Sequence, residues 1–169
     1  PIKETTILKT LLFVCTGNTC RSPMAEALFD ELIDDHPRLR GKVRCESAGT
    51  MACDGARITE FAKNALVDMG VDASRHRAQQ LTAKLADNAD LILTMEAQHL
   101  DELEAICPQA DHKAHTLKGY VAGVEGFPGD GEFDIEDPFR GQADDYEEVA
   151  AEIKAAVSKL IEKLDGEME

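Results

Sequence analysis

The chain has 169 residues, of which 43% are hydrophobic and 30% are charged. A chain of this length and composition can bury a core without disulfides or metal ions, which indicates one globular domain over residues 1–169. Its formal net charge of −15 argues against nucleic-acid binding, because phosphate backbones select basic protein surfaces.

The first predicted element is a buried strand at Ile7–Val14, a continuous run of bulky and β-branched residues typical of a parallel sheet. A loop follows, after which Ser22 and Pro23 are typical of the N-cap and first residue of a helix. Leu28 and Leu32 continue this helix at the spacing of one apolar face.

The alternation of apolar strands and amphipathic helices continues to the end of the chain. The sequence predicts strands at Val43–Ser47, Leu91–Met95 and Ala114–Leu117, and helices at Thr59–Met69, from about Thr82, at Glu96–Cys107 and at Asp145–Leu164. This order predicts an α/β fold of three layers, a parallel sheet of four or five strands with helices on both faces. Ligands of such folds bind beyond the carboxyl ends of the strands.

The loop after the first strand combines a thiol, a glycine and a guanidinium, at Cys15, Gly17 and Arg21. A helix N-terminus has unpartnered N–H groups and a partial positive charge, so a loop wrapped over it can bind an oxyanion. We expect Gly17 to let successive N–H groups turn inward, and the planar fork of Arg21 to bind phosphate oxygens. The residues expected to bind phosphate are Thr16, Gly17, Asn18, Thr19, Cys20, Arg21 and Ser22.

In that positive field, Cys15 is expected to be a thiolate at neutral pH and therefore a nucleophile. The alternative is a small core residue at a strand end, which is the commoner role of a free cysteine. That interpretation leaves the glycine, the arginine and the helix start as coincidences. The loop therefore predicts transfer of a phosphoryl group to the Cys15 sulfur.

These residues resemble the loop of the low-molecular-weight protein tyrosine phosphatases, which reads Cys, five residues, Arg, then Ser or Thr. Ser47–Thr50, His76–Ala78 and Asp137–Phe139 also fall where that family has its corresponding segments. The resemblance implies a single phosphatase domain that hydrolyses phosphorylated proteins through a phosphocysteine on Cys15, with Arg21 binding the phosphoryl group. It implies neither a metal nor another cofactor.

Asp137 lies in a segment without periodicity, from Gly119 to Gln142, and loops of that length are commonly functional. The resemblance implies that Asp137 is the general acid that protonates the leaving group and then the base toward water. Taken without the phosphate loop, the same aspartate would be interpreted as the start of a turn before Pro138.

Three polar side chains receive supporting roles from the resemblance. It implies that Asn18 and Ser47 brace the phosphate loop through hydrogen bonds, and that Ser22 eases departure of the thiolate. For Ser47, a strand-end hydroxyl with a local partner is an open alternative. His76 also falls on a family position, but a lone histidine is commonly structural and we assign it no chemistry.

Thr19 bears on the choice of substrate. The loop Cys15–Ser22 is identical to that of protein arginine phosphatases, whereas tyrosine-directed members usually carry an aliphatic residue in place of Thr19. A hydroxyl beside the scissile P–N bond and a smaller apolar surface favour phosphoarginine over phosphotyrosine. The alternative is a tyrosine phosphatase in which Thr19 is neutral. Phe139 would line the cleft in either subtype, and Arg140 departs from the usual residue of both.

Two other functional classes share parts of this pattern. An arsenate reductase would need two further cysteines near the helix between Thr82 and Asp90, and that segment contains none. A silent phosphoprotein-binding module would keep the anion loop and lose the nucleophile or the acid. Cys15, Arg21 and Asp137 are all present, which favours the enzyme.

The cysteines also bear on compartment and regulation. Five cysteines without scaffold spacing or paired Cys-x-x-Cys motifs indicate a reducing compartment and no structural zinc. No stretch has the length of a membrane span and the start lacks a signal sequence, so we expect a cytoplasmic protein without membrane contact. A reversible Cys15–Cys20 disulfide would switch the enzyme off, although Cys20 could equally be a packing thiol.

Overall fold

The computed structural model of the chain describes residues 9–129 and 131–168, and their sheet confirms the predicted fold class. The four strands of this part of the chain are β1 (Lys9–Cys15), β2 (Val43–Gly49), β3 (Leu91–Thr94) and β4 (Ala114–Thr116). They are ordered β2-β1-β3-β4 and every pairing is parallel. The carboxyl ends of all four strands therefore meet at one edge.

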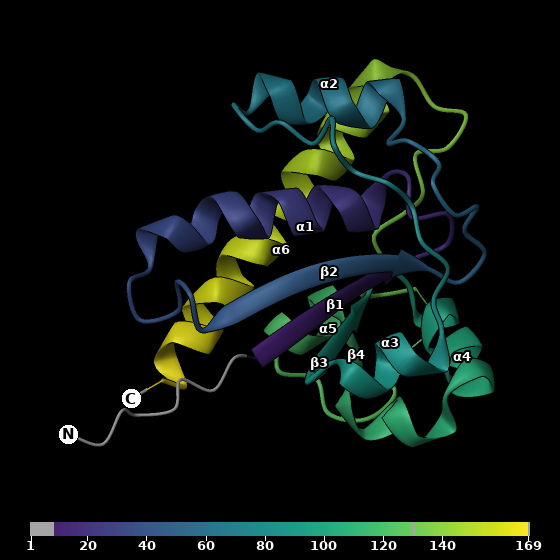
Figure 1. Ribbon diagram of the computed structural model, residues 1–169, viewed down its shortest axis with the longest axis vertical. Coiled ribbons are helices and arrows are strands. Elements are labelled where there is room, and N and C mark those ends of the chain that lie inside the picture. Colours follow the sequence, from purple (N-terminus) through teal and green to yellow (C-terminus); the bar gives the residue numbers. More distant parts are fainter. Residues whose placement is uncertain (1–8, 130, 169) are drawn as a thin grey trace.

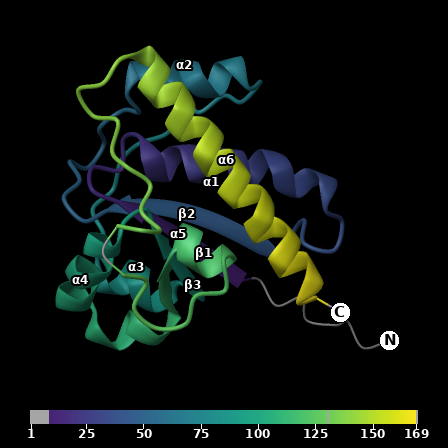
Figure 2. The ribbon, with the colours of Figure 1, turned by 180° about the vertical axis from the view of Figure 1, so that it is seen from behind.

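The helices cover both faces of the sheet (Figures 1 and 2). The α-helices are α1 (Arg21–Leu32), α2 (Glu60–Asp68), α3 (Ala83–Asn88), α4 (Ala97–Ile106), α5 (Leu117–Val121) and α6 (Ala143–Gly166), and the short 3-10 helices are η1 (Ile33–Asp35) and η2 (Pro108–Lys113). In Figure 1, α1, α2 and α6 lie above the sheet, and α3 and α4 lie below it. None of the helices in residues 9–129 and 131–168 is long and apolar enough to cross a bilayer.

Alternate side chains of β1 pack into two separate cores. Leu11 and Phe13 belong to the core shared with α1, α2, α5 and α6, whereas Leu12 and Val14 belong to the core shared with α3 and α4. This division follows from the period of two along a strand. Because both faces are covered, the strand is apolar along almost its whole length, which is the pattern that the sequence shows.

Helix α1 begins two residues earlier than predicted. Its first residue is Arg21, and its N-cap is Cys20, which makes no side-chain capping hydrogen bond. The prediction of Ser22 as N-cap was wrong, because the Ser22 hydroxyl is directed into the loop rather than to the helix backbone. The earlier start places the guanidinium-bearing residue itself in the first turn.

The segment from Gly119 to Gln142 is less irregular than predicted at its beginning. Helix α5 starts at Leu117 and is capped by Thr116, whose hydroxyl accepts a hydrogen bond from the Gly119 N–H. Further along, the Ile135 N–H donates to the Met95 carbonyl at 2.8 Å, and Ile135 is fully buried. This contact fixes the long segment to the carboxyl end of β3, beside the phosphate loop.

Candidate active site

The loop from Cys15 to Arg21 lies at the carboxyl edge of the sheet, between β1 and α1. Cys15 is the last residue of β1 and Arg21 the first of α1, and each is 2% exposed. The only non-glycine residue of this loop with positive φ is Asn18, at 56°. The expectation that Gly17 supplies the unusual conformation was therefore wrong, and an asparagine, which tolerates the left-handed region, supplies it instead.

A glycine outside the loop allows its close packing. Gly49 is the last residue of β2, and a Cβ atom there would collide with the Thr16 carbonyl oxygen and lie 2.9 Å from the Asn18 nitrogen. The Thr50 N–H donates to the Cys15 carbonyl, and the Met51 N–H to the Thr16 carbonyl, each at 2.9 Å. The chain after β2 therefore forms one wall of the loop.

The fully buried side chain of Asn18 connects the loop to two distant segments. Its Nδ2 donates to Ser22 Oγ at 2.8 Å and to Ser47 Oγ at 2.9 Å, and its Oδ1 accepts from the Gln79 N–H at 2.9 Å. The Asn18 carbonyl also accepts from His76 Nε2 at 2.7 Å. The structure thus brings together the predicted bracing pair, Asn18 and Ser47, at hydrogen-bond distance.

The nucleophile candidate has a hydroxyl partner. Cys15 Sγ lies 2.9 Å from the Oγ of Ser22, which is itself fully buried. Because Asn18 Nδ2 already donates to that Oγ, the hydroxyl hydrogen of Ser22 is free to point at the sulfur. The Ser22 hydroxyl can therefore donate a hydrogen bond to the Cys15 sulfur.

Cys20 is a buried thiol directly before Arg21. It is 8% exposed, and burial, followed by the nearby Cys15, raises the pKa of its thiol well above the ordinary range. Arg21 counteracts this effect only in part. Cys20 therefore remains a protonated, weakly nucleophilic thiol in the reduced protein.

The guanidinium of Arg21 is held by three groups from two other segments. Its Nη1 lies 3.1 Å from Glu96 Oε2 and donates to the Ile135 carbonyl at 2.8 Å, while its Nη2 lies 3.5 Å from Asp137 Oδ2. Such fixed planar donors suit a tetrahedral oxyanion. The buried Arg21 therefore links the phosphate loop to the N-terminus of α4 and to the segment that carries Asp137.

Asp137 contacts both the turn that follows it and the guanidinium of Arg21. Its Oδ1 accepts from the Phe139 N–H at 3.0 Å, which is the turn contact, and its Oδ2 faces Arg21. The side chain is 44% exposed. A half-exposed carboxyl beside the anion-binding guanidinium is in a place to exchange a proton with a substrate.

Two residues of the site were missed by sequence reasoning. Glu96 is the N-cap of α4 and forms a capping box with His99. In the structure, His99 is fully buried, and its Nε2 lies 2.9 Å from Thr16 Oγ1. The spacing of a capping box could have suggested the pair, but only the fold places it against the loop.

Exposed apolar side chains flank the site. Phe139 is 67% exposed and Met51 is 74% exposed, on the segments that follow Asp137 and β2 respectively. The Arg140 guanidinium lies 5.6 Å from the centre of the Phe139 ring, and Arg140 has a φ of 68°. A hollow of about 340 Å³ beside Asp137 includes both Phe139 and Arg140 in its lining. Thr19 is half-buried, and its carbonyl accepts from the Thr59 N–H at 2.9 Å.

The remaining cysteines are dispersed over the fold. Cys107 is buried in the core on the α3 and α4 side and donates to Asp87, whereas Cys45 lies on the opposite face of the sheet and donates to Asp30. Cys53 is exposed in the segment after β2. This dispersion does not provide the paired thiols that an arsenate reductase requires.

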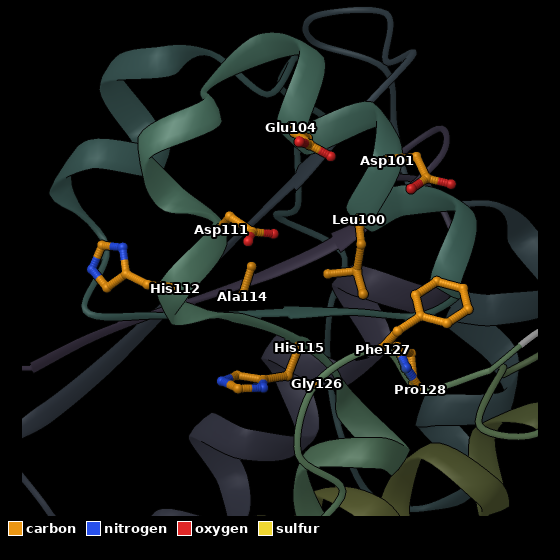
Figure 3. A pocket seen from close by; sticks show the side chains of 10 residues that line it. All are labelled: Leu100, Asp101, Glu104, Asp111, His112, Ala114, His115, Gly126, Phe127 and Pro128. Carbon is orange, nitrogen blue, oxygen red and sulfur yellow. The ribbon is translucent and has the colours of Figure 1, made fainter.

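A second hollow, of about 400 Å³, lies between α4, η2 and the segment around Phe127 (Figure 3). Carboxylates of Asp101, Glu104 and Asp111 surround an opening with Phe127 at one side. It contains none of the predicted site residues. No cluster of three His, Cys, Asp or Glu side chains in the described part of the chain is arranged to hold a metal ion.

The chain is similar in sequence to known phosphatases. Residues 10–169 match the family model described as low molecular weight phosphotyrosine protein phosphatase. The chain is 39% identical over 157 residues to a protein-arginine-phosphatase of Geobacillus stearothermophilus, covering 93% of this chain and 97% of that protein. It is 35% identical over 158 residues to the probable low molecular weight protein-tyrosine-phosphatase EpsP of Ralstonia solanacearum, covering 94% and 97%.

Solved structures show the same likeness in three dimensions. The YwlE arginine phosphatase from Geobacillus stearothermophilus superposes with a TM-score of 0.82 at 38% identity, covering 94% of each chain. A mutant of the YwlE arginine phosphatase with a phosphorylated active site serine superposes with a TM-score of 0.82 at 34% identity, covering 95% of this chain and 99% of that one.

Proposed function

The chain belongs to the low molecular weight phosphotyrosine protein phosphatase family, and from this membership we propose that it hydrolyses phosphoarginine in substrate proteins through a phosphocysteine on Cys15. We propose Cys15, Arg21 and Asp137 as the catalytic residues and the loop from Thr16 to Ser22 as the phosphate site. The observation that carries the proposal is the buried Arg21, which faces Asp137 from the end of a loop that begins at Cys15.

In the first step, the Cys15 sulfur attacks phosphorus, so that a P–S bond forms as the P–N bond of phosphoarginine breaks. The loop N–H groups and Arg21 bind the non-bridging oxygens, whose charge they stabilise in the transition state. Asp137 in its protonated form gives its proton to the departing guanidino nitrogen. The Ser22 hydroxyl stabilises the attacking thiolate from 2.9 Å.

In the second step, water attacks phosphorus and the P–S bond breaks. Asp137, now a carboxylate, takes a proton from that water, which returns the residue to its acid form. Inorganic phosphate leaves, and the Cys15 thiolate departs with the help of the hydrogen bond from Ser22. The Asn18 contacts to Ser22 and Ser47 keep the loop in one conformation throughout, since they do not involve the substrate.

The preference for phosphoarginine is supported by Thr19 and by the relatives. Thr19 places a short polar side chain in the phosphate loop, where a hydroxyl can bond to a guanidino group and a phenyl ring finds little apolar surface. Two relatives named protein-arginine-phosphatase are 39% and 37% identical to this chain. The net charge of −15 also suits a cationic reaction product.

Phosphotyrosine is the second candidate, and Phe139 favours it. This exposed ring beside Asp137 could stack against a phenyl group, and relatives named tyrosine phosphatases also match the chain at 35% identity. Arg140, held over the Phe139 ring, would face a bound guanidinium with like charge. We therefore propose Thr19 and Phe139 as the two residues that set specificity in opposite directions.

The test compares kcat/KM on two peptides that differ only in carrying phosphoarginine or phosphotyrosine. We expect the unaltered enzyme to prefer phosphoarginine and Thr19→Ile to lose most of that preference, because the aliphatic side chain replaces the hydroxyl. Cys15→Ser, the control for the nucleophile, should be inactive on both peptides. A preference for phosphotyrosine in the unaltered enzyme would contradict the assignment of phosphoarginine as the substrate. It would leave the phosphocysteine mechanism unaffected.

We further propose a cytoplasmic location, since a thiolate nucleophile works best where thiols are kept reduced. Peroxide would there convert Cys15 to a sulfenic acid, and attack by the Cys20 sulfur would form a disulfide with loss of water. The raised pKa of Cys20 makes this step slow, because little thiolate is present. Peptide mass mapping after peroxide treatment should detect the Cys15–Cys20 crosslink, and its absence would rule out this form of protection.

A further inference from the structure

His99 makes two hydrogen bonds that tie α4 to the phosphate loop. It is fully buried at the third position of α4, its Nδ1 lies 3.1 Å from the Glu96 N–H, and its Nε2 lies 2.9 Å from Thr16 Oγ1. Thr16 directly follows the proposed nucleophile Cys15. The imidazole thus spans from a helix N-terminus to the first residue of the anion cradle.

These contacts determine where the ring carries its proton. A backbone N–H can only donate, so Nδ1 accepts and is unprotonated. The proton of the neutral ring therefore lies on Nε2, which donates to the Thr16 hydroxyl. Burial, followed by the nearby Arg21, lowers the pKa of His99 to about 4, and the ring is neutral at neutral pH.

The charged groups around the ring belong to several elements. Those that face His99 are Arg21 from α1, Glu96 and Glu102 from α4, and Asp134 and Asp137 from the segment before α6. His99 Nε2 is 3.6 Å from Glu96 Oε2, the atom that also pairs with Arg21 Nη1 at 3.1 Å. A ring fixed in this place limits the movement of both Thr16 and the carboxylate that orients Arg21.

We propose that His99 is a positioning residue that holds the two ends of the phosphate loop in the conformation that binds a phosphoryl group. At one end its Nε2–H fixes Thr16, and at the other it packs beside the Glu96–Arg21 ion pair. The inference rests on the proposed function, because the loop matters only if it binds a phosphoryl group. Misplacement of catalytic groups by about 1 Å can cost on the order of 100-fold in rate.

The His99 substitutions separate the helix cap from the loop contact. In His99→Asn, the short side chain can still accept from the Glu96 N–H and cannot reach Thr16. In His99→Gln, the longer side chain can still donate to Thr16. Thr16→Val removes the acceptor without changing His99 at all, so it tests the contact even if a His99 variant fails to fold. His112→Asn, at an exposed histidine of η2, is the matched control.

Each variant is measured by kcat/KM on para-nitrophenyl phosphate and by calorimetric titration with inorganic phosphate. We expect kcat/KM to fall about 10- to 100-fold in both Thr16→Val and His99→Asn, with weaker phosphate binding. The double variant Thr16→Val/His99→Asn should have a kcat/KM no lower than that of either single variant, because both substitutions remove the same contact. The kcat/KM and the phosphate affinity of His99→Gln should lie closer to the values of the unaltered enzyme than those of His99→Asn do. His112→Asn should have the same values as the unaltered enzyme.

A loss of kcat/KM in Thr16→Val/His99→Asn that equals the product of the two single losses would overturn the proposal. So would a lowered melting temperature with kcat/KM and phosphate affinity unchanged, since that result describes a purely structural histidine. Phosphate affinity separates this inference from the proposed function. An enzyme inactive on both phosphopeptides, whose phosphate affinity still depends on the His99–Thr16 pair, would refute the function and leave the positioning role intact.

Discussion

Ser22 accepts a hydrogen bond from the Asn18 amide and lies 2.9 Å from the Cys15 sulfur, so its hydroxyl hydrogen has one evident acceptor. We expect Ser22→Ala to lower kcat about 10- to 100-fold, because a hydrogen bond to a charged group contributes roughly 1.5–3 kcal/mol. Stopped-flow measurement should show a larger burst relative to the steady state, as breakdown of the phosphocysteine becomes slower.

The control for this substitution is Ser158→Ala, which removes an exposed hydroxyl bonded to the Lys154 carbonyl of α6. It should leave kcat unchanged. A Ser22→Ala enzyme whose kcat is within twofold of the unaltered value would show that the hydroxyl does not act on the sulfur.

At the residue scale, the sequence was sufficient to predict the site residues that lie together in one short segment. Cys15, Arg21 and Ser22 are within eight positions of one another, so their type and spacing were sufficient. Glu96 and His99 were not predicted as site residues, because nothing in the local sequence relates them to the loop. Their contacts with Arg21 and Thr16 cross about 80 residues of sequence, and only the folded chain shows them.

At the scale of elements, the end of β2 limits the shape of the phosphate loop. Gly49 leaves no room for a Cβ atom against the Thr16 carbonyl and the Asn18 nitrogen. We expect Gly49→Ala to lower the free energy of unfolding by about 1–3 kcal/mol, as overpacking does, and to lower kcat/KM because the loop must shift. Urea unfolding and peptide kinetics measure the two effects.

Gly166→Ala is the matched control, since Gly166 lies at the end of α6 and a Cβ there meets no atom within 4 Å. It should be neutral or slightly stabilising, because alanine favours a helix. Full activity and unchanged stability in Gly49→Ala would contradict the close packing of β2 against the loop.

Element boundaries were predicted less well than element types. The strands and the long helices followed from apolar periodicity, which packing against two cores preserves. The start of α1 was misplaced because serine is a common N-cap residue, whereas the Ser22 hydroxyl lies 2.9 Å from the Cys15 sulfur within the loop. Helix α5 was missed because five residues are too few for a periodic signal.

At the scale of the whole molecule, buried ionisable groups make stability depend on pH. The folded protein holds His99 neutral with a pKa of about 4, below its ordinary value of about 6.5. Between these values the unfolded chain binds more protons, so stability is lost as the pH falls, by on the order of 3 kcal/mol. Burial raises the pKa of Glu26 and Asp30, and these carboxyls oppose the trend at acidic pH.

Thermal unfolding at a series of pH values tests this account. The melting temperature of the unaltered protein should fall as the pH falls from about 6.5 to 4. The melting temperature of His99→Asn should fall less over the same pH range. His112→Asn, which removes an exposed imidazole, should follow the unaltered protein. Parallel curves for all three proteins would show that His99 titrates alike in the folded and unfolded states.

The fold class was predictable because the chain repeats one consistent pattern. Apolar strands alternate with amphipathic helices. A parallel sheet covered by helices on both faces buries the apolar side chains of all these segments together. The carboxyl edge of the sheet then followed as the place of the loop that begins at Cys15. The path of the segment from Gly119 to Gln142 did not follow, because the anchoring of Ile135 to Met95 depends on tertiary contacts.

The most direct test of the central claim is detection of a phosphocysteine formed from a phosphoarginine peptide. Ser22→Ala, in which breakdown of the phosphocysteine is expected to be slow and Asp137 is retained as the acid, is mixed with the peptide, quenched within milliseconds and digested for mass spectrometry. The account predicts that the peptide containing Cys15 gains the mass of one phosphoryl group, and that Cys15→Ser/Ser22→Ala forms no phosphocysteine. Turnover of the peptide by the unaltered enzyme, without a phosphoryl group on Cys15 at any quench time, would contradict it.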